Sequence, residues 1–106
     1  MNETFLNQIA INVLSAFLHA IGIPTNEIDI DIKDHGPFRI FTIQVRVPDS
    51  MAATIDPGET LDKLVSYMDH HNALPTAVRF QAYNVQVYVC PCGCGTFLYA
   101  SIYHTA

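Results

Sequence analysis

The sequence predicts a single α+β domain over residues 1–106, in which a four-stranded antiparallel sheet carries two helices on one face. Two observations lead to this class. Apolar residues recur at helical spacing in two segments, whereas they alternate with polar residues in four others. The resulting order is α-β-β-α-β-β, and a turn signature separates the strands of each pair.

The first predicted helix runs from Glu3 to Ile21 and is apolar on most of its circumference. Its polar residues lie on one narrow line, formed by Thr4, Gln8, Asn12, Ser15 and His19. A surface helix usually has a narrower apolar stripe. We therefore expect the rest of the domain, a second copy of the chain, or both to cover this helix.

The first hairpin follows. Its first strand, Glu27 to Lys33, alternates isoleucine with acidic residues, and Asp34 to Pro37 form the turn. The second strand runs from Phe38 to Val47. Its apolar alternation shifts by one residue at Ile40 and Phe41, which predicts a β-bulge at that point.

The second helix is predicted to begin after a loop over residues 49–55. Asp56 is the expected N-cap, and Pro57 occupies the first helical position. Asn72 and Pro75 close the helix.

The second hairpin has the arms Ala77 to Cys90 and Thr96 to His104, joined by the turn Pro91 to Gly95. Alternation in the second arm places Tyr99 and Tyr103 on the outer face of the sheet. The residues expected to be buried in the first arm are Tyr83, Val85, Val87 and Val89.

The composition constrains the partners. Half of the residues are hydrophobic, only 14% are charged, and the formal net charge is −5. The shortage of charge favours a buried interface, most simply a homo-oligomer. The negative balance argues against direct nucleic-acid binding, which needs Lys and Arg, and favours a protein partner with a basic surface.

A candidate partner-binding surface combines acidic residues with tyrosines. Neighbouring acids of the first strand share a face and lie about 6.6 Å apart. Exposed tyrosine is enriched in interfaces. The alternative is a solvent-facing strand whose charges prevent edge pairing. The candidate residues are Glu27, Asp29, Asp31, Asp34, Tyr99 and Tyr103.

The three cysteines, Cys90, Cys92 and Cys94, lie together at the turn of the second hairpin. Thiolates at such a turn can bind zinc or iron. The segment resembles one knuckle of a zinc ribbon or rubredoxin, where Cys-Pro-x-Cys-Gly lies between two strands. The spacing differs, since Cys90 to Cys92 is one residue shorter than in that pattern, Cys90 to Cys94 is one residue longer, and a second knuckle is absent.

A fourth metal ligand is expected, if a metal is bound, from His70, His71, His35 or a partner copy. His104 lies too far along its strand from the cysteines. The alternative is that the cysteines are free thiols in a Gly-rich turn. Three clustered cysteines do not form a secreted disulfide framework, and no basic segment precedes the first helix, so we expect a cytoplasmic protein without a membrane span.

Together these features predict a small acidic, non-enzymatic interaction protein, of the inhibitor or immunity type, that binds and blocks a protein partner as a homodimer. No nucleophilic triad, phosphate-binding loop or carboxylate pair is evident, and no cofactor is expected. The alternative is a zinc- or iron-binding module that uses Cys90, Cys92 and Cys94.

Overall fold

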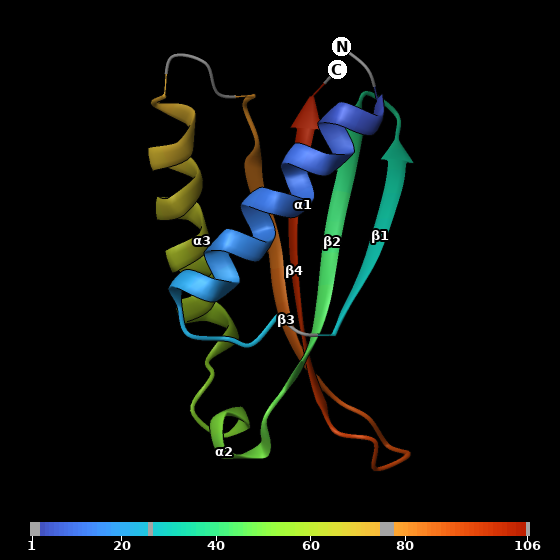
Figure 1. The fold of residues 1–106 in the computed structure, drawn as a ribbon, viewed down its shortest axis with the longest axis vertical. Helices are drawn as coiled ribbons and strands as arrows, with labels where there is room; N and C mark the ends of the chain where they lie inside the picture. The colour runs from blue at the N-terminus through green and yellow to red at the C-terminus, as the bar shows by residue number, and fades with distance from the viewer. Residues whose placement is uncertain (1–2, 26, 75–77, 106) are drawn as a thin grey trace.

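Helices on one side and an antiparallel sheet on the other form two layers in the computed structural model, which describes residues 3–25, 27–74 and 78–105 (Figure 1). The four strands are ordered β1-β2-β4-β3. Pairing of β2 with β4 therefore joins the two hairpins in the middle of the sheet. The predicted α+β class and the four-stranded antiparallel sheet are confirmed.

Helix α1, Glu3–Ala20, lies across the sheet and packs over β2 and β4 (Figure 1). Gly22 follows the end of the helix, and its φ of 84° reverses the chain and lets the Ile23 N–H donate to the Leu18 carbonyl. The fold of the chain itself covers much of its apolar circumference, although Phe5 is 57% exposed. The fully buried positions are Ala10, Leu14, Phe17 and Leu18.

The first hairpin consists of β1, Ile28–His35, and β2, Phe38–Val47. Asp34 was predicted in the turn, but it pairs with Arg39 within the hairpin ladder. Glu27 lies just before β1 instead of beginning it. The turn is shorter than predicted because Gly36 adopts a φ of 66° and reverses the chain tightly.

The predicted bulge at Ile40 and Phe41 is wrong, because β2 pairs without interruption with both β1 and β4. The prediction assumed that every apolar residue of β2 faces the core. Phe41 and the later apolar residues do so, whereas Phe38 and Ile40 lie on the opposite face.

The segment between the hairpins contains one more helix than predicted. Helix α2, Asp49–Ala52, forms a single turn inside the expected loop. Helix α3, Pro57–Asn72, begins as predicted, since the Asp56 carboxylate accepts a 2.9 Å hydrogen bond from the Gly58 N–H. The predicted stop at Pro75 lies outside the described residues.

The second hairpin consists of β3, Gln81–Val89, and β4, Thr96–Thr105. A register shift between Ala82 and Asn84 leaves Tyr83 as an extra residue in β3. Tyr83 is consequently 55% exposed, and Val89 at the end of the strand is 69% exposed. The prediction that both are buried is wrong. It assumed that inward and outward side chains alternate without interruption through the bulge at Tyr83, and that the helices cover the sheet as far as Val89. Ala77, the predicted start of this arm, is not among the described residues.

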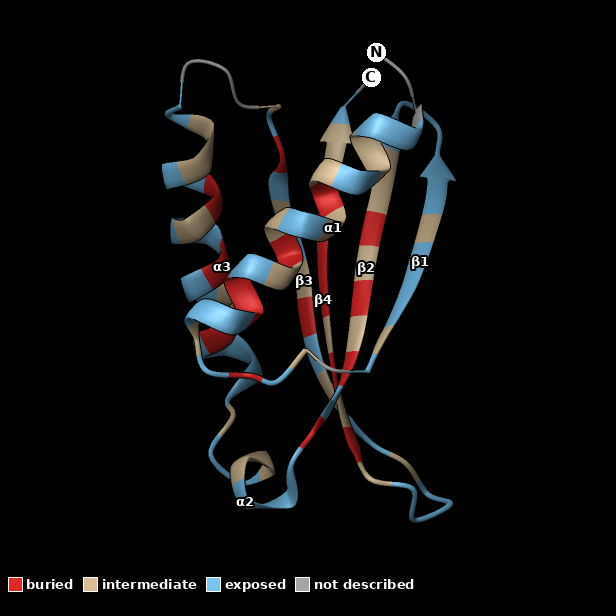
Figure 2. Cartoon of the chain, in the orientation of Figure 1, coloured by how far each residue is buried: buried red, intermediate tan, exposed pale blue. Residues whose placement is uncertain are grey.

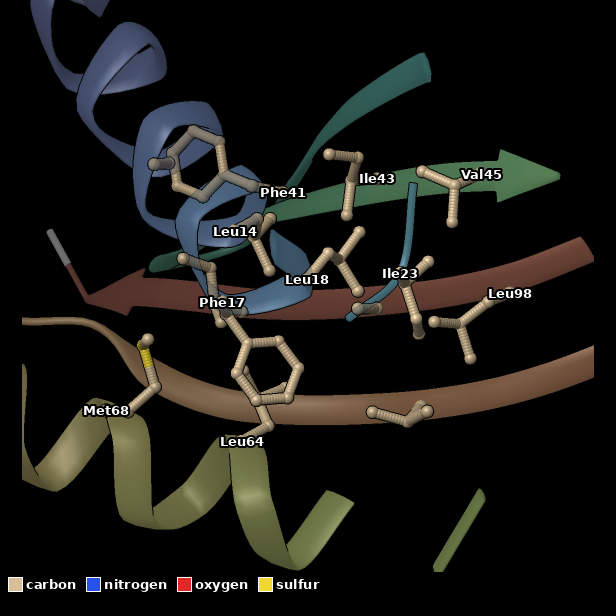
Figure 3. Close-up of a cluster of buried hydrophobic side chains, with 14 of the residues drawn as sticks. Leu14, Phe17, Leu18, Ile23, Phe41, Ile43, Val45, Leu64, Met68 and Leu98 are labelled. Carbon is tan, nitrogen blue, oxygen red and sulfur yellow. The ribbon is translucent and has the colours of Figure 1, made fainter. Parts of the chain in front are cut away.

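The hydrophobic core lies between the sheet and helices α1 and α3, where buried residues of both layers face each other (Figure 2). Phe17 of α1 contacts the ring of Tyr67 from α3 at 5.5 Å, so the two helices also pack against each other. Figure 3 shows the centre of this core, with side chains from both helices directed at the inner face of the sheet. Among the described residues, no helix covers the opposite face of the sheet.

Candidate functional site

The uncovered side of the sheet, which we call the outer sheet face, carries an organised set of side chains. Its members are fixed by the strand register, because alternate residues of each strand point away from the helices. They are Asp29, Asp31, Lys33, His35, Phe38, Ile40, Thr42, Gln44, Arg46, Gln81, Asn84, Gln86, Tyr88, Phe97, Tyr99, Ser101 and Tyr103.

One end of this face forms a hollow of about 450 Å³, the aromatic hollow, which is lined by His35, Phe38, Ile40, Ala82, Tyr83 and Tyr103. Phe38 packs edge-on against Tyr103, with ring centroids 5.4 Å apart, and Tyr83 does so at 6.1 Å. Phe38 and Tyr83 nevertheless remain 41% and 55% exposed. The hollow is therefore an apolar, preorganised surface in contact with solvent.

The middle of the outer sheet face is polar. Thr42 and Ser101, which are 59 positions apart in the chain, share a hydroxyl–hydroxyl hydrogen bond of 2.8 Å. Around this pair lies a hollow of about 420 Å³, the polar trough, to which Tyr99 and the acidic strand contribute. Its lining is Asp29, Ile30, Asp31, Lys33, Thr42, Gln44, Asn84, Gln86, Tyr99 and Ser101.

The structure divides the four acidic residues of the predicted surface. Asp29 and Asp31 lie in the polar trough, where Lys33 Nζ is 3.5 Å from the Asp31 carboxylate. Glu27 lies at a separate depression beside Arg46. Asp34, three positions after Asp31, points to the other face of the strand.

Asp34 is engaged in a two-pronged ion pair. The Arg39 guanidinium donates to both carboxylate oxygens, from Nε at 2.7 Å and from a terminal nitrogen at 3.1 Å. These hydrogen bonds hold the pKa of Asp34 below its ordinary value, with the charge of Arg39 adding to the effect and slight desolvation opposing it. The contact fixes the tip of the first hairpin.

The structure brings both predicted tyrosines to the outer sheet face. Tyr99 lines the polar trough and contacts the ring of Tyr88 at 6.5 Å, whereas Tyr103 lines the aromatic hollow. Sequence reasoning missed Phe38, Ile40 and Tyr83. The signal for Phe38 and Ile40 was present, because they share parity with the polar residues Thr42 and Gln44.

The three cysteines form a second candidate site at the turn of the second hairpin, residues 90–95, which we call the cysteine turn. The Cys90 N–H donates to the Gly95 carbonyl at 2.9 Å, and the Gly93 N–H donates to the Cys90 carbonyl at 3.1 Å. Gly93 and Gly95 have φ values of 81° and 128°, which glycine adopts without strain. Three sulfur atoms thereby converge within 4.8 Å of one another.

The histidines expected to complete a metal site lie at the other end of the sheet. His35 borders the aromatic hollow. His71 bonds the Val78 carbonyl through Nε2 at 3.0 Å and packs near the ring of Phe80, and exposed His70 is its neighbour at the end of α3. The cysteine turn follows Val89 at the far end of β3 (Figure 1).

Strand length puts these groups out of reach of one another within a single chain. Thr96 pairs with Val89 beside the cysteine turn, and Thr105 pairs with Phe38 beside the first hairpin turn. The ten-residue strand between these ends spans about 30 Å at the usual rise per residue. Among the described residues, the metal-binding group consists of Cys90, Cys92 and Cys94 and includes no histidine.

Comparison of the chain with protein-family models, curated proteins and solved structures gives no match. In the described part of the chain, no helix has both the length and the hydropathy needed to cross a membrane.

Proposed function

We propose that this chain is a non-enzymatic binding protein that holds a segment of a protein partner on its outer sheet face and thereby blocks that part of the partner. The single observation that carries the proposal is the exposed aromatic hollow on a sheet face without a helix. Proteins usually cover such a surface or use it for recognition.

The aromatic hollow suits an apolar anchor from the partner. Its walls are aromatic rings held against one another, so they lose little conformational freedom when a partner binds. Tyrosine also combines apolar area with a hydroxyl group that can stay hydrogen-bonded. Removal of one central tyrosine from an interface costs about 2 kcal/mol or more, which corresponds to about a thirtyfold weaker affinity.

The polar trough beside the hollow suits a basic segment. Asp29 and Asp31 line it, and one nearby cation, Lys33, offsets part of their charge. The net charge of −5 for the whole chain acts in the same direction over longer distances. The proposed partner segment therefore combines an aromatic or branched apolar side chain with Lys or Arg residues.

A random-peptide display selection on the intact protein tests this proposal. We expect the enriched peptides to carry Lys or Arg beside an apolar anchor, and to bind a Phe38→Ser/Tyr83→Ser variant at least about thirtyfold more weakly. Phe5→Ser is the matched control, since Phe5 is an aromatic residue of α1 that is at least as exposed as Phe38 and Tyr83. The proposal is contradicted if the selected peptides bind the double variant as tightly as they bind the wild type. It is also contradicted if selection on the wild type enriches no peptides beyond those that selection on the double variant enriches.

Charge reversal tests the basic character of the partner separately. Asp29→Lys with Asp31→Lys should weaken the selected peptides most at low salt, where charges on the surface are least screened. A loss that is independent of salt argues against a basic segment.

The expected homodimer has two candidate faces, the first helix and a sheet face, and a dimer through the outer sheet face would compete with the partner for the same surface. Sedimentation of the wild type and of the Phe38→Ser/Tyr83→Ser variant separates the two possibilities. A monomeric wild type supports an external partner, whereas a dimer that dissociates in the double variant assigns the outer sheet face to a second copy and overturns the proposal.

A further inference from the structure

We infer that the cysteine turn binds one cuprous ion through the thiolates of Cys90, Cys92 and Cys94, independently of the outer sheet face. The backbone of the cysteine turn has a defined conformation. Two hydrogen bonds within the turn and two glycines at positive φ hold its shape without any ion. The site is therefore preorganised by the hairpin.

The sulfur chemistry points to a metal ion in place of a disulfide. The sulfur of Cys92 lies within disulfide-bonding reach of the sulfurs of both Cys90 and Cys94, and the sulfurs of Cys90 and Cys94 lie 2.7 Å apart. One sulfur can form only one disulfide at a time, so any disulfide leaves one of the three as a thiol. A metal ion is the partner that can engage all three sulfurs together.

The number of donors selects the ion. A structural zinc site in a protein has four ligands in a tetrahedral arrangement. The cysteine turn offers three sulfurs, and the histidines at the end of α3 and at the first hairpin turn lie at the opposite end of the sheet. Cuprous copper is a soft ion that thiolates bind selectively, and three thiolates satisfy its coordination.

The surroundings fit a negatively charged complex. Three thiolates and one cuprous ion carry a net charge of −2, and binding to the thiols releases three protons. The Arg46 guanidinium lies beside Gly95 at the end of the turn, since a Cβ at Gly95 would meet its Nε at 2.9 Å. This cation offsets part of the charge, although Glu27 also lines the depression beside Arg46.

The exposure of the site implies an exchangeable ion. Cys92 and Cys94 are exposed and Cys90 is partly buried, in the turn between β3 and β4. Thiols of another molecule can approach such an ion directly. We therefore assign the cysteine turn to the uptake and release of cuprous ions and not to a structural role.

Anaerobic titration of the reduced full chain with cuprous ion, in competition with a chromophoric cuprous chelator, tests the inference. We expect one cuprous ion per chain. Cys92→Ser removes a metal ligand, so it should lower the cuprous affinity by more than the 10–100-fold that follows when a residue that only hydrogen-bonds a ligand is removed. His70→Ala should bind as the wild type does. Circular dichroism should show that both variants are folded, because both side chains are exposed.

Three outcomes would overturn the inference. Zinc bound at one ion per two chains, without competitive binding of the cuprous ion, would show a shared tetrahedral site. Unchanged cuprous affinity in Cys92→Ser would place the ion elsewhere. Failure of the reduced chain to compete with the chelator for the cuprous ion would show that the three cysteines form only thiols and disulfides and do not bind this ion.

Discussion

The carboxamide of Asn72 links the end of α3 to the beginning of β3, and its removal provides a sharp test of how the two layers are joined. Asn72 Nδ2 donates to the Phe80 carbonyl at 2.7 Å, and the Phe80 N–H donates to Asn72 Oδ1 at 3.0 Å. Phe80 is fully buried and contacts the ring of Phe41 at 5.8 Å. The two hydrogen bonds thus satisfy the backbone of a core residue.

The expected effect of Asn72→Ala follows from these two bonds. Each buried backbone group left without a partner costs about 1–3 kcal/mol. Asn72 is partly buried, so water can replace some of the loss. We expect the free energy of unfolding to fall by about 2–4 kcal/mol, a large share of the roughly 5–15 kcal/mol typical of a domain.

Urea denaturation followed by circular dichroism measures this change. With an m-value of roughly 2 kcal/mol/M, the midpoint should fall by about 1–2 M. Asn12→Ala is the matched control, because Asn12 accepts only an exposed helical hydrogen bond from Gln8. We expect that control to change stability by less than about 0.5 kcal/mol. A loss of that small size in Asn72→Ala would refute the reasoning.

Two further predictions concern caps and charges. Asp56→Ala removes the acceptor for the Gly58 N–H and should lower the free energy of unfolding, measured by urea denaturation, by about 1 kcal/mol. Asp56→Ser keeps a side-chain acceptor and should retain most of that stability. Equal losses of stability in the two variants would show that the cap is unimportant. The ion pair with Arg39 lowers the pKa of Asp34 in the folded state. It therefore stabilises the fold fully at pH values above the ordinary carboxyl pKa of 3.8, and this stabilisation is lost as the pH falls through the lowered pKa of the folded state. NMR titration should find the Asp34 carboxyl ionising below 3.8 in the wild type and nearer to 3.8 in Arg39→Gln; a wild-type value at or above 3.8 would contradict the prediction.

Local signals in the sequence determined the order of the four strands and the two long helices, but not the single turn of helix α2. The limits of β2 match the prediction, and α3 begins after Asp56 and Pro57 as expected. These features depend on residues a few positions apart, through alternation, capping and the fixed φ of proline. The glycines of the cysteine turn are likewise readable, because a tight turn needs positive φ at such positions.

The sequence does not predict which side chains of a strand face the core where apolar residues occur on both faces of that strand. Phe38 and Ile40 were assigned to the core, and the resulting mismatch with Phe41 was interpreted as a bulge. The actual bulge, at Tyr83, depends on how β3 meets β4. Hydrophobicity alone identifies a buried surface but not which of two surfaces is covered, since that depends on where the helices pack.

The candidate sites show the same division between local and tertiary information. The sequence by itself determined the fold class, the caps, and the clustering of Cys90, Cys92 and Cys94, because each results from short-range spacing. Tertiary structure alone decided that Tyr83 joins Tyr103 and that the histidines lie a full strand length from the cysteines. The physical reason is that pairing between β2 and β4 joins segments about half a chain apart, and no local pattern encodes that register.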